Sequence, residues 1–234
     1  MSKLYLIPTP IAEGNHTATS KEIIDKVHLI KYFVVERLKT ARRFLKSVDK
    51  DIVIDDIHFF EIDQNHSESD LTTFLNCLKE GHEVGLMSEA GCPAIADPGH
   101  LAVAWCHKNS IDVVPMVGPS SIILALMASG FNGQNFTFHG YLPNKKPELA
   151  QRLKQIESFV DKGNQTQIFI ETPYRNGFMI ETLIDTLSPQ RLLCVCVDLD
   201  SDQAFIKCMP LSSWKKLDLE VLHKRPAIFL LGKV

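Results

Sequence analysis

The sequence has no apolar run near the length needed to cross a bilayer, about 20 residues. It also has no low-complexity tract, and hydrophobic residues make up 45% of its 234 residues. That composition supplies enough apolar surface to fold, so a mainly disordered protein is excluded. The apolar stretch at residues 4–7 is too short for a signal peptide. We therefore expect a cytoplasmic protein that does not bind membranes.

Three kinds of common motif are missing. The six cysteines are scattered through apolar contexts, and without a secretion signal they are expected to be reduced rather than paired in disulfides. Cys194 and Cys196 share a face of a predicted strand, but no second pair has metal-ligand spacing, so we predict no metal site. Neither the phosphate-binding pattern G-x-x-x-x-G-K-[ST] nor a G-x-G-x-x-G follows the first strand.

The chain instead alternates strand and helix patterns, which predicts an α/β fold. In the first half, strands are expected at residues 4–7, 32–35, 84–88 and 111–116. Helices are expected from Thr19, capped by a Thr19/Glu22 box, and at 39–48, 71–79 and 101–108. In the second half, strands are expected at 136–139, 167–171, 192–197, 204–208 and 227–231, and helices at 120–128, 147–160 and 177–187.

A segment rich in proline and glycine, residues 115–119, divides the chain near its middle. It predicts two α/β domains, residues 1–116 with a parallel sheet and residues 117–234 with a mixed sheet. Loops at 8–14, 88–99, 118–121 and 171–175 follow predicted strands or open a helix. In open α/β sheets ligands bind at the carboxyl ends of the strands, so these loops are candidates for a site. The alternatives are plain strand-to-helix connections and, for the serines at 120 and 121, a helix N-cap.

Five segments resemble, in the same order, motifs of the tetrapyrrole methylase superfamily, the class III S-adenosyl-L-methionine (SAM) methyltransferases. They are LYLIPTPIAEGN at 4–15, SEAGCPAIADPG at 88–99, VGPSS at 117–121, ASGF with FTFHGYLP at 128–143, and IETPYR at 170–175. The family's counterparts include LYLVxTPIGN, SDAGTPGISDPG, PGPSA and YESPHR. The similarity is greatest to the branch that methylates ribose 2′-hydroxyls of small-subunit ribosomal RNA.

The resemblance implies two α/β domains with a cofactor cleft between them, SAM as cofactor, and a homodimer acting on ribosomal RNA or the small ribosomal subunit. It also implies which residues contact the cofactor. The matching positions in this chain are Pro10, Ile11, Ser88, Ala90, Cys92, Pro93, Ile95, Ser120, Ser121, Thr172, Pro226, Ala227 and Ile228.

Two segments depart from the ribosomal RNA branch. Where that branch has E-D-T-R-x-T-R-R, this chain reads ERLKTARR at 36–43, so Arg-Leu-Lys replaces Asp-Thr-Arg. The segment 198–203 lacks the Lys and His of the branch's E-L-T-K-x-H-E-E. Two alternatives therefore stay open: a methyltransferase acting on a tetrapyrrole or other small molecule, and a SAM-binding protein with weak or lost catalysis that acts through partner binding.

Charge is distributed unevenly in this region. The chain has a net charge of −3, yet residues 37–50 carry +5 and residues 51–70 carry −7. Helical spacing places Lys39, Arg42, Arg43 and Lys46 on one face, which can bind the phosphates of an RNA substrate. The alternative is a solvated helix beside an acidic loop.

The chemistry implied by the resemblance needs positioning and a base. Positioning can supply about 7–11 kcal/mol of the barrier reduction, and a general base acting on a ribose hydroxyl adds about 10²–10⁴-fold. We predict Glu36 and Glu89 as catalytic carboxylates, because each lies beside a candidate loop. Glu171 also lies beside a loop but is interpreted as a capping or salt-bridged acid. Among the histidines, His139 is the one expected to face the cleft.

Overall fold

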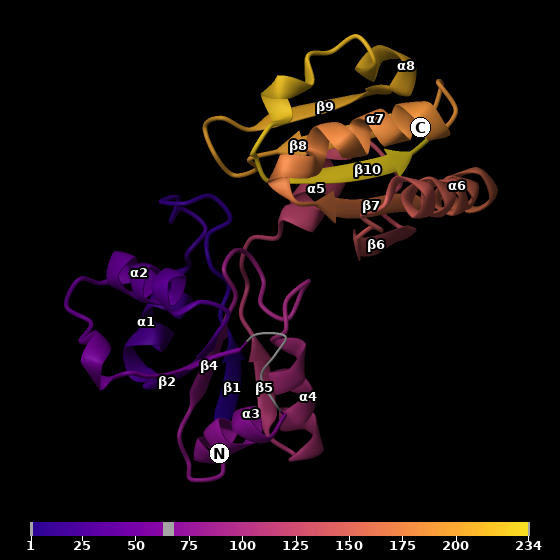
Figure 1. Cartoon of the computed structure of the whole chain (residues 1–234). Coiled ribbons are helices and arrows are strands. Elements are labelled where there is room, and N and C mark those ends of the chain that lie inside the picture. The colour runs from indigo at the N-terminus through magenta and orange to yellow at the C-terminus, as the bar shows by residue number, and fades with distance from the viewer. Residues whose placement is uncertain (1, 63–67, 234) are drawn as a thin grey trace. The chain divides into compact units, whose positions relative to one another are not determined.

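The computed structural model describes residues 2–62 and 68–233. The chain folds into two compact units, Met1–Ser120 and Ser121–Val234, which we describe one at a time (Figure 1). Each unit is built around a five-stranded sheet, parallel in the first and mixed in the second, which confirms the predicted α/β fold class. The predicted domain boundary between residues 116 and 117 stays a prediction.

The strands of the first unit pair in parallel in the order β3-β2-β4-β1-β5. Their bounds are β1 Lys3–Leu6, β2 Tyr32–Val35, β3 His58–Glu61, β4 Val84–Met87 and β5 Asp112–Pro115. The helices are α1 Lys21–Leu29, α2 Leu38–Val48, α3 Glu68–Leu75 and α4 His100–Lys108, with short 3-10 helices at Ile54–Asp56 and Asn76–Leu78. Sequence patterns located all of these strands except β3.

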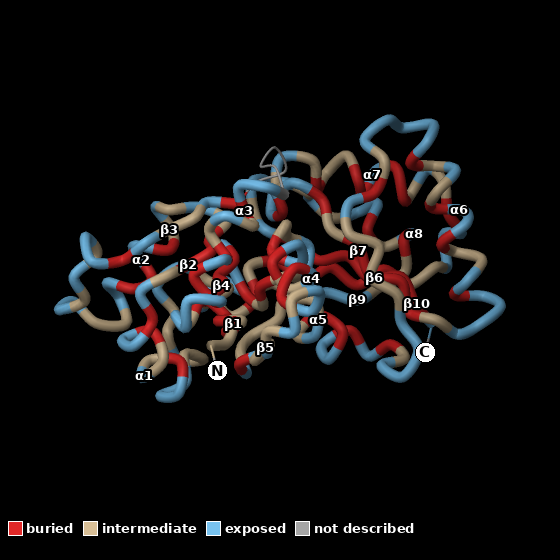
Figure 2. The backbone as a smooth tube through the Cα atoms, turned by 90° about the horizontal axis from the view of Figure 1, so that it is seen from below, coloured by how far each residue is buried: buried red, intermediate tan, exposed pale blue. Residues whose placement is uncertain are grey.

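Side chains alternate along the strands, so apolar groups lie on both faces of this sheet. Phe33 and Val35 of β2 pack with α1 and α2, whereas Val34 packs on the other face with α3 and α4. Figure 2 shows β2 and β4 as largely buried between these layers. The first unit is therefore a sheet sandwiched between two helical layers, with α1 and α2 on one side and α3 and α4 on the other.

The start of α1 differs from the predicted one, and the start of α2 is capped by a residue distant in the sequence. Ser20 rather than Thr19 caps α1, because the Ser20 hydroxyl accepts a hydrogen bond from the Ile23 N–H at 3.3 Å. The first turn of α2 has no side-chain cap from Arg37; instead the Leu38 N–H donates to the Glu61 carboxylate of β3 at 2.9 Å. The acidic segment after α2 is thus more than a loop, because it contains an edge strand whose last residue caps α2.

The second unit has a mixed sheet in the order β6-β7-β10-β8-β9, in which β6 and β7 are parallel and the other pairs antiparallel. The strands are β6 Phe136–Tyr141, β7 Thr166–Glu171, β8 Leu192–Val197, β9 Phe205–Pro210 and β10 Ala227–Gly232. The helices are α5 Ser121–Ser129, α6 Lys146–Gly163, α7 Asn176–Thr186 and α8 Leu211–Trp214, with 3-10 helices η3 Pro173–Arg175 and η4 Leu219–Leu222.

The faces of the second sheet are covered unequally. Residues of α6, α7 and α8 pack with Phe169 and Phe229 in one large apolar cluster. Helix α5 packs on the opposite face, where Cys194 and Cys196 are buried among apolar neighbours with their sulfur atoms 3.9 Å apart. In the described parts of both units, no helix combines the length and apolar character that a membrane crossing requires.

Candidate active site

The topology of the first sheet creates a natural binding position. Strands β1 and β4 are neighbours, yet the chain leaves β1 for α1 on one face and leaves β4 for α4 on the other. In doubly wound sheets, such a reversal opens a crevice at the carboxyl ends of the strands, where ligands bind. The loops that follow these two strands are residues 8–14 and 88–99, two of the four loops singled out by the sequence.

The structure joins these two loops directly. Thr9 and Gly91 form an isolated antiparallel bridge in which each N–H donates to the other's carbonyl at 3.0 Å. Gly91 has a φ of +77°, a left-handed conformation that glycine adopts readily. The Ser88 hydroxyl donates to the Gly91 carbonyl at 3.3 Å. The two loops are therefore held together by hydrogen bonds.

The third candidate loop approaches the same place. The Cys92 thiol donates to the Pro119 carbonyl at 3.3 Å. A Cβ added to Gly118 would lie only 2.2 Å from Cβ of Pro8, so the chain can pass here only without a side chain. Three loops, separated by about 30 to 110 positions in the sequence, thus meet within the first unit.

The predicted cofactor residues of the first unit lie on these three loops. Pro10, Ile11, Cys92 and Ser120 are half-buried, whereas Ser88 and Pro93 are buried. Ala90 and Ile95 are exposed. The side chain of Ile95 is 54% accessible although it is apolar. The three loops that carry these residues meet, and Ser121 occupies the first position of α5 in the second unit.

Sequence reasoning missed Asp97, which shapes the loop at 88–99. Its carboxylate accepts hydrogen bonds from the Ala94 N–H at 3.0 Å and the Gly99 N–H at 2.7 Å. Ala94 and Ala96 both have left-handed φ values, +66° and +62°. Burial raises the pKa of Asp97, although these two N–H groups oppose the shift. An Asp two residues before a glycine is an Asx-turn signal, and that signal could have identified it.

The two predicted catalytic carboxylates are neighbours. Glu36 follows β2 and Glu89 follows β4, and the register of these adjacent strands places Val35 opposite Met87. The Glu89 N–H donates to Oε2 of Glu36 at 3.1 Å. Burial raises the pKa of the Glu36 carboxyl, and the negative charges of Glu89 and Asp97 act in the same direction. Glu36 is therefore a carboxylate whose proton affinity is increased by its surroundings.

Glu89 has a different environment. Its Oε1 lies 3.2 Å from Nε of Arg37 and accepts a hydrogen bond from the Thr40 hydroxyl at 3.3 Å. These two contacts occupy the Glu89 carboxylate and hold it at the start of α2. Of the two predicted carboxylates, Glu36, whose pKa is raised by burial, is thus the better placed to act as a base.

The predicted basic face is present on α2. Lys39, Arg42, Arg43 and Lys46 are all exposed, while Phe44 and its apolar neighbours are buried beneath them. Arg43 forms an ion pair with Glu13 of the first loop. Lys46 donates to the Lys50 carbonyl at 2.8 Å, and the Arg42 guanidinium lies 5.6 Å from the centre of the Phe59 ring. Intramolecular contacts therefore occupy part of this face.

In the second unit, Thr172 and Pro226 lie at one end of the sheet, because Ala227 pairs with Glu171 across β10 and β7. The Thr172 N–H donates to Glu171 at 2.7 Å, and the Glu171 carboxylate lies 3.1 Å from Nε of Arg175. Glu171 is buried and forms an ion pair with Arg175, which agrees with its interpretation as a capping or salt-bridged acid. Ala227 and Ile228 are buried in the middle strand β10.

His139 is engaged within its own unit. Its Nε2 lies 2.8 Å from Oε1 of Gln167, and its Nδ1 lies 3.2 Å from a guanidinium nitrogen of Arg152. Because the guanidinium can only donate, Nδ1 accepts and the Nε2–H donates to Gln167. Burial lowers the pKa of His139, which favours this neutral form.

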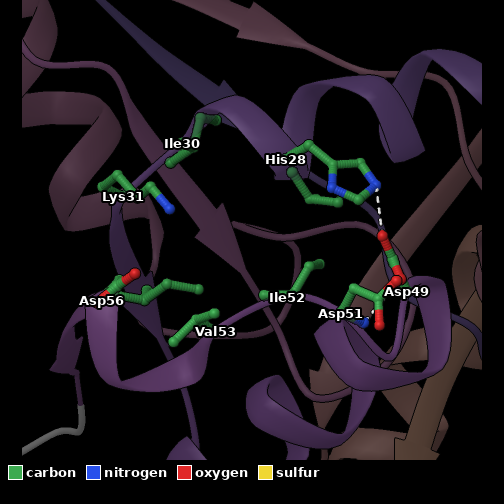
Figure 3. A pocket seen from close by; sticks show the side chains of 10 residues that line it. His28, Ile30, Lys31, Asp49, Asp51, Ile52, Val53 and Asp56 are labelled. Carbon is green, nitrogen blue, oxygen red and sulfur yellow. Dashed lines mark hydrogen bonds and ion pairs between the residues drawn. The ribbon is translucent and has the colours of Figure 1, made fainter.

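A pocket of about 260 Å³ lies elsewhere in the first unit (Figure 3). Lys31 and Ile57 in its lining immediately precede β2 and β3, so the pocket is at the amino edge of the parallel sheet. Figure 3 shows His28 directed toward Asp49, and the two groups are 3.5 Å apart. None of the predicted site residues lines this pocket, which is on the opposite edge from the three loops.

Comparison with known proteins identifies the family. Over 187 residues the chain is 31% identical to the ribosomal RNA small subunit methyltransferase I of Thermotoga maritima, and the match covers 80% of this chain and 78% of that protein. The chain belongs to the ribosomal RNA small subunit methyltransferase I family. This confirms the family resemblance and the assignment to the methyltransferases.

Further similarities agree with this family. The ribosomal RNA small subunit methyltransferase I of Buchnera aphidicola subsp. Schizaphis graminum is 28% identical over 232 residues, which cover 97% of this chain and 77% of that protein. The crystal structure of the methyltransferase CobJ shares the fold, with a TM-score of 0.65 at 15% identity over 100% of this chain and 95% of that one. No family model matches the sequence. The chain is thus a methyltransferase with the tetrapyrrole methylase fold.

Proposed function

We propose that this protein transfers a methyl group from SAM to a ribose 2′-hydroxyl of small-subunit ribosomal RNA, in the cytoplasm and as a homodimer. The observation that carries the proposal is the group of three joined loops at the carboxyl edge of the first sheet, beside the half-buried Glu36. The names of its relatives support the acceptor.

The three loops have the features that close binding of SAM requires. Gly91 and Gly118 leave room where a side chain would strike or crowd neighbouring atoms, and the peptide groups of 88–99 offer donors and acceptors. The exposed side chain of Ile95 provides apolar surface for an adenine ring. In the second unit, Thr172 and residues 226–228 would add further contacts. When bound, SAM supplies a methyl group attached to a positively charged sulfur, which is a good leaving group.

Glu36 would remove the proton from the attacking hydroxyl. Its raised pKa brings its proton affinity closer to that useful near neutral pH, where a general base is most effective. The Glu89 N–H would hold Oε2 in place, leaving Oε1 to accept the proton. Arg37 and Thr40 would keep Glu89 in position, and the positive charge of Arg37 also opposes the rise in the Glu36 pKa.

The exposed basic residues of α2 would contact RNA phosphates. Lys39, Arg42, Arg43 and Lys46 lie together on this helix, and Arg43 is linked to the first loop through Glu13. The net charge of −3 disfavours tight, non-specific binding to naked nucleic acid. A shaped RNA or an assembled small subunit, which offers protein contacts as well, is therefore the favoured substrate.

The deciding experiment maps 2′-O-methyl groups on small-subunit ribosomal RNA from a strain that lacks the gene, together with calorimetry of SAM binding to the purified protein. We expect one or a few methyl groups to disappear and to return when the wild-type protein is supplied. An unchanged map with intact SAM binding would favour a small-molecule acceptor or a binding protein without catalysis. Absence of SAM binding at millimolar concentration would overturn the proposal altogether.

A further inference from the structure

Tyr174 in the second unit is an aromatic residue with most of its side chain exposed. It is 71% accessible and belongs to η3, within the candidate loop at 171–175 and two residues after Thr172. Single exposed apolar residues are common on protein surfaces, and the groups that surround Tyr174 are what distinguish it.

Two cationic or ionisable side chains stand around this ring. Nζ of Lys224 lies 5.7 Å from the centre of the Tyr174 ring. The imidazole of His223 meets the ring edge to face, with the centres 6.4 Å apart. Both residues are exposed and come from the connection between η4 and β10, about 50 positions further along the chain. The fold therefore brings an aromatic ring and basic groups together from two separate segments.

The backbone beneath this group is firmly held. The Lys224 N–H donates to the Pro173 carbonyl at 3.1 Å, and Lys224 has a left-handed φ of +59°. The fully buried Asn176 side chain donates to the carbonyls of Leu222 and Arg225, each at 2.8 Å. A lysine held in a conformation that favours glycine is the kind of strain found at functional positions.

The two arginines of these segments are committed to holding the structure. Arg175 binds the Glu171 carboxylate at 3.1 Å and the Asn144 carbonyl at 2.8 Å. Arg225 binds the Asp198 carboxylate and the Gln203 carbonyl, each at 2.6 Å. Because Arg175 neutralises Glu171, that carboxylate presents little charge to oppose a phosphate near Tyr174.

We propose that Tyr174, His223 and Lys224 form a docking site for an unpaired nucleotide of an RNA substrate. The ring would stack on the base, and Lys224 with His223 would contact the adjoining phosphate. Stacking on an aromatic side chain combined with a neighbouring cation is the usual means of binding unpaired RNA. The inference rests on the proposed function, because it takes RNA to be the acceptor, and it adds a contact surface separate from α2.

The test measures binding of a labelled single-stranded oligoribonucleotide by fluorescence anisotropy, using the full chain with SAM present. Tyr174→Ala should weaken binding about 5- to 150-fold, the range found when one stacked base loses its aromatic partner. Tyr174→Phe and Tyr174→Trp should retain most of the affinity, because stacking needs the ring and not the hydroxyl. Lys224→Gln should weaken binding and lower its dependence on salt.

Tyr141→Ala is the matched control. Tyr141 is 62% exposed on β6 of the same unit, and no cation–π contact to it is seen among the described residues. Its loss should leave RNA affinity unchanged. Calorimetry with SAM should give the same affinity for all variants, which would show that the cofactor site is intact.

The outcomes separate this inference from the proposed function. If Tyr174→Ala binds and methylates RNA as well as Tyr141→Ala does, the docking site is refuted while the methyltransferase activity stands; that result is also expected if a protein partner covers this surface. If Tyr174→Phe loses as much affinity as Tyr174→Ala, stacking is refuted. If the wild-type protein neither binds nor methylates RNA, the proposed function fails together with this inference.

Discussion

Replacing Glu36 with glutamine removes the proposed base with little change in shape. The glutamine carbonyl oxygen can still accept the Glu89 N–H bond of 3.1 Å, so the loop after β4 should stay in place. What is lost is the negative charge and the ability to take a proton. General base catalysis contributes about 10²–10⁴-fold, which corresponds to about 2.7–5.4 kcal/mol in the barrier. We therefore expect the single-turnover rate of methyl transfer to fall by that factor while SAM affinity is unchanged.

The pH dependence of the methylation rate provides an independent test of Glu36 as the base. The pKa of Glu36 is raised in the folded protein, so the carboxyl is protonated at pH values where an ordinary glutamate is already charged. The methylation rate should rise with pH as Glu36 loses its proton, with a midpoint above the usual glutamate value of about 4.3. In Glu36→Gln this rise should be absent.

In Glu36→Gln the stability of the folded protein should change in the opposite direction to its activity. A carboxyl with a raised folded-state pKa contributes stability that is fully present below its unfolded pKa and is lost as pH rises through its folded pKa. Above its folded pKa the charged, partly buried Glu36 is therefore a destabilising group. Glu36→Gln should unfold at the same or a higher temperature than the wild type. A slower, less stable variant would indicate a structural role instead.

Glu89→Gln provides the comparison. This change removes the ion pair with Arg37 but leaves the backbone N–H that contacts Glu36. We expect a rate loss within about tenfold, since exposed pairs contribute about 0–1 kcal/mol. The reasoning is refuted if Glu36→Gln keeps a rate within tenfold of the wild type, or if Glu89→Gln loses more activity than Glu36→Gln.

Three further changes test the other parts of the site. A double variant with Arg42→Gln and Arg43→Gln should weaken RNA binding and lower the slope of log K against log salt by about one to two units, measured by anisotropy between low and physiological salt. Gly118→Ala should destabilise the first unit by about 1–3 kcal/mol in urea unfolding and weaken SAM binding, because the new methyl group would lie 2.2 Å from Pro8. Ala94→Gly should be neutral or stabilising by up to about 1 kcal/mol, since Ala94 is held at a left-handed φ that disfavours a side chain; clear destabilisation would show that Ala94 packs more tightly than its conformation suggests.

The sequence predicted the central strands because their burial produces continuous apolar runs. Val84–Met87, for example, is buried at all four positions and has the pattern of a buried strand. Strand β3 was missed for the opposite reason: it is an edge strand with exposed ends and half-buried phenylalanines, within an acidic segment. The cap of α1 was placed one residue early because Thr19 and Ser20 are both suitable cap residues, and only the backbone decides between them.

The site was predicted in part. Parallel strands bring their carboxyl ends to one edge, so the meeting of the loops after β1 and β4 follows from the order of elements. The contacts between them do not follow, because the Thr9–Gly91 bridge and the Gly118–Pro8 approach join positions far apart in the chain. Asp97 acts on backbone N–H groups of its own loop, so the signal that identifies it is its Asx-turn spacing to Gly99 and not a motif of reactive side chains.

The departure at residues 37–39 has a structural interpretation that bears on catalysis. Arg37 occupies the position where the ribosomal RNA branch has an aspartate, and its partner Glu89 occupies another aspartate position of that branch. An aspartate at 37 would repel Glu89, whereas Arg37 attracts it and fixes the loop after β4. The substitution therefore changes what holds Glu89 but leaves Glu36 and its N–H contact in place. For that reason the altered segment favours a retained base with a modified acceptor surface over a protein that has lost catalysis.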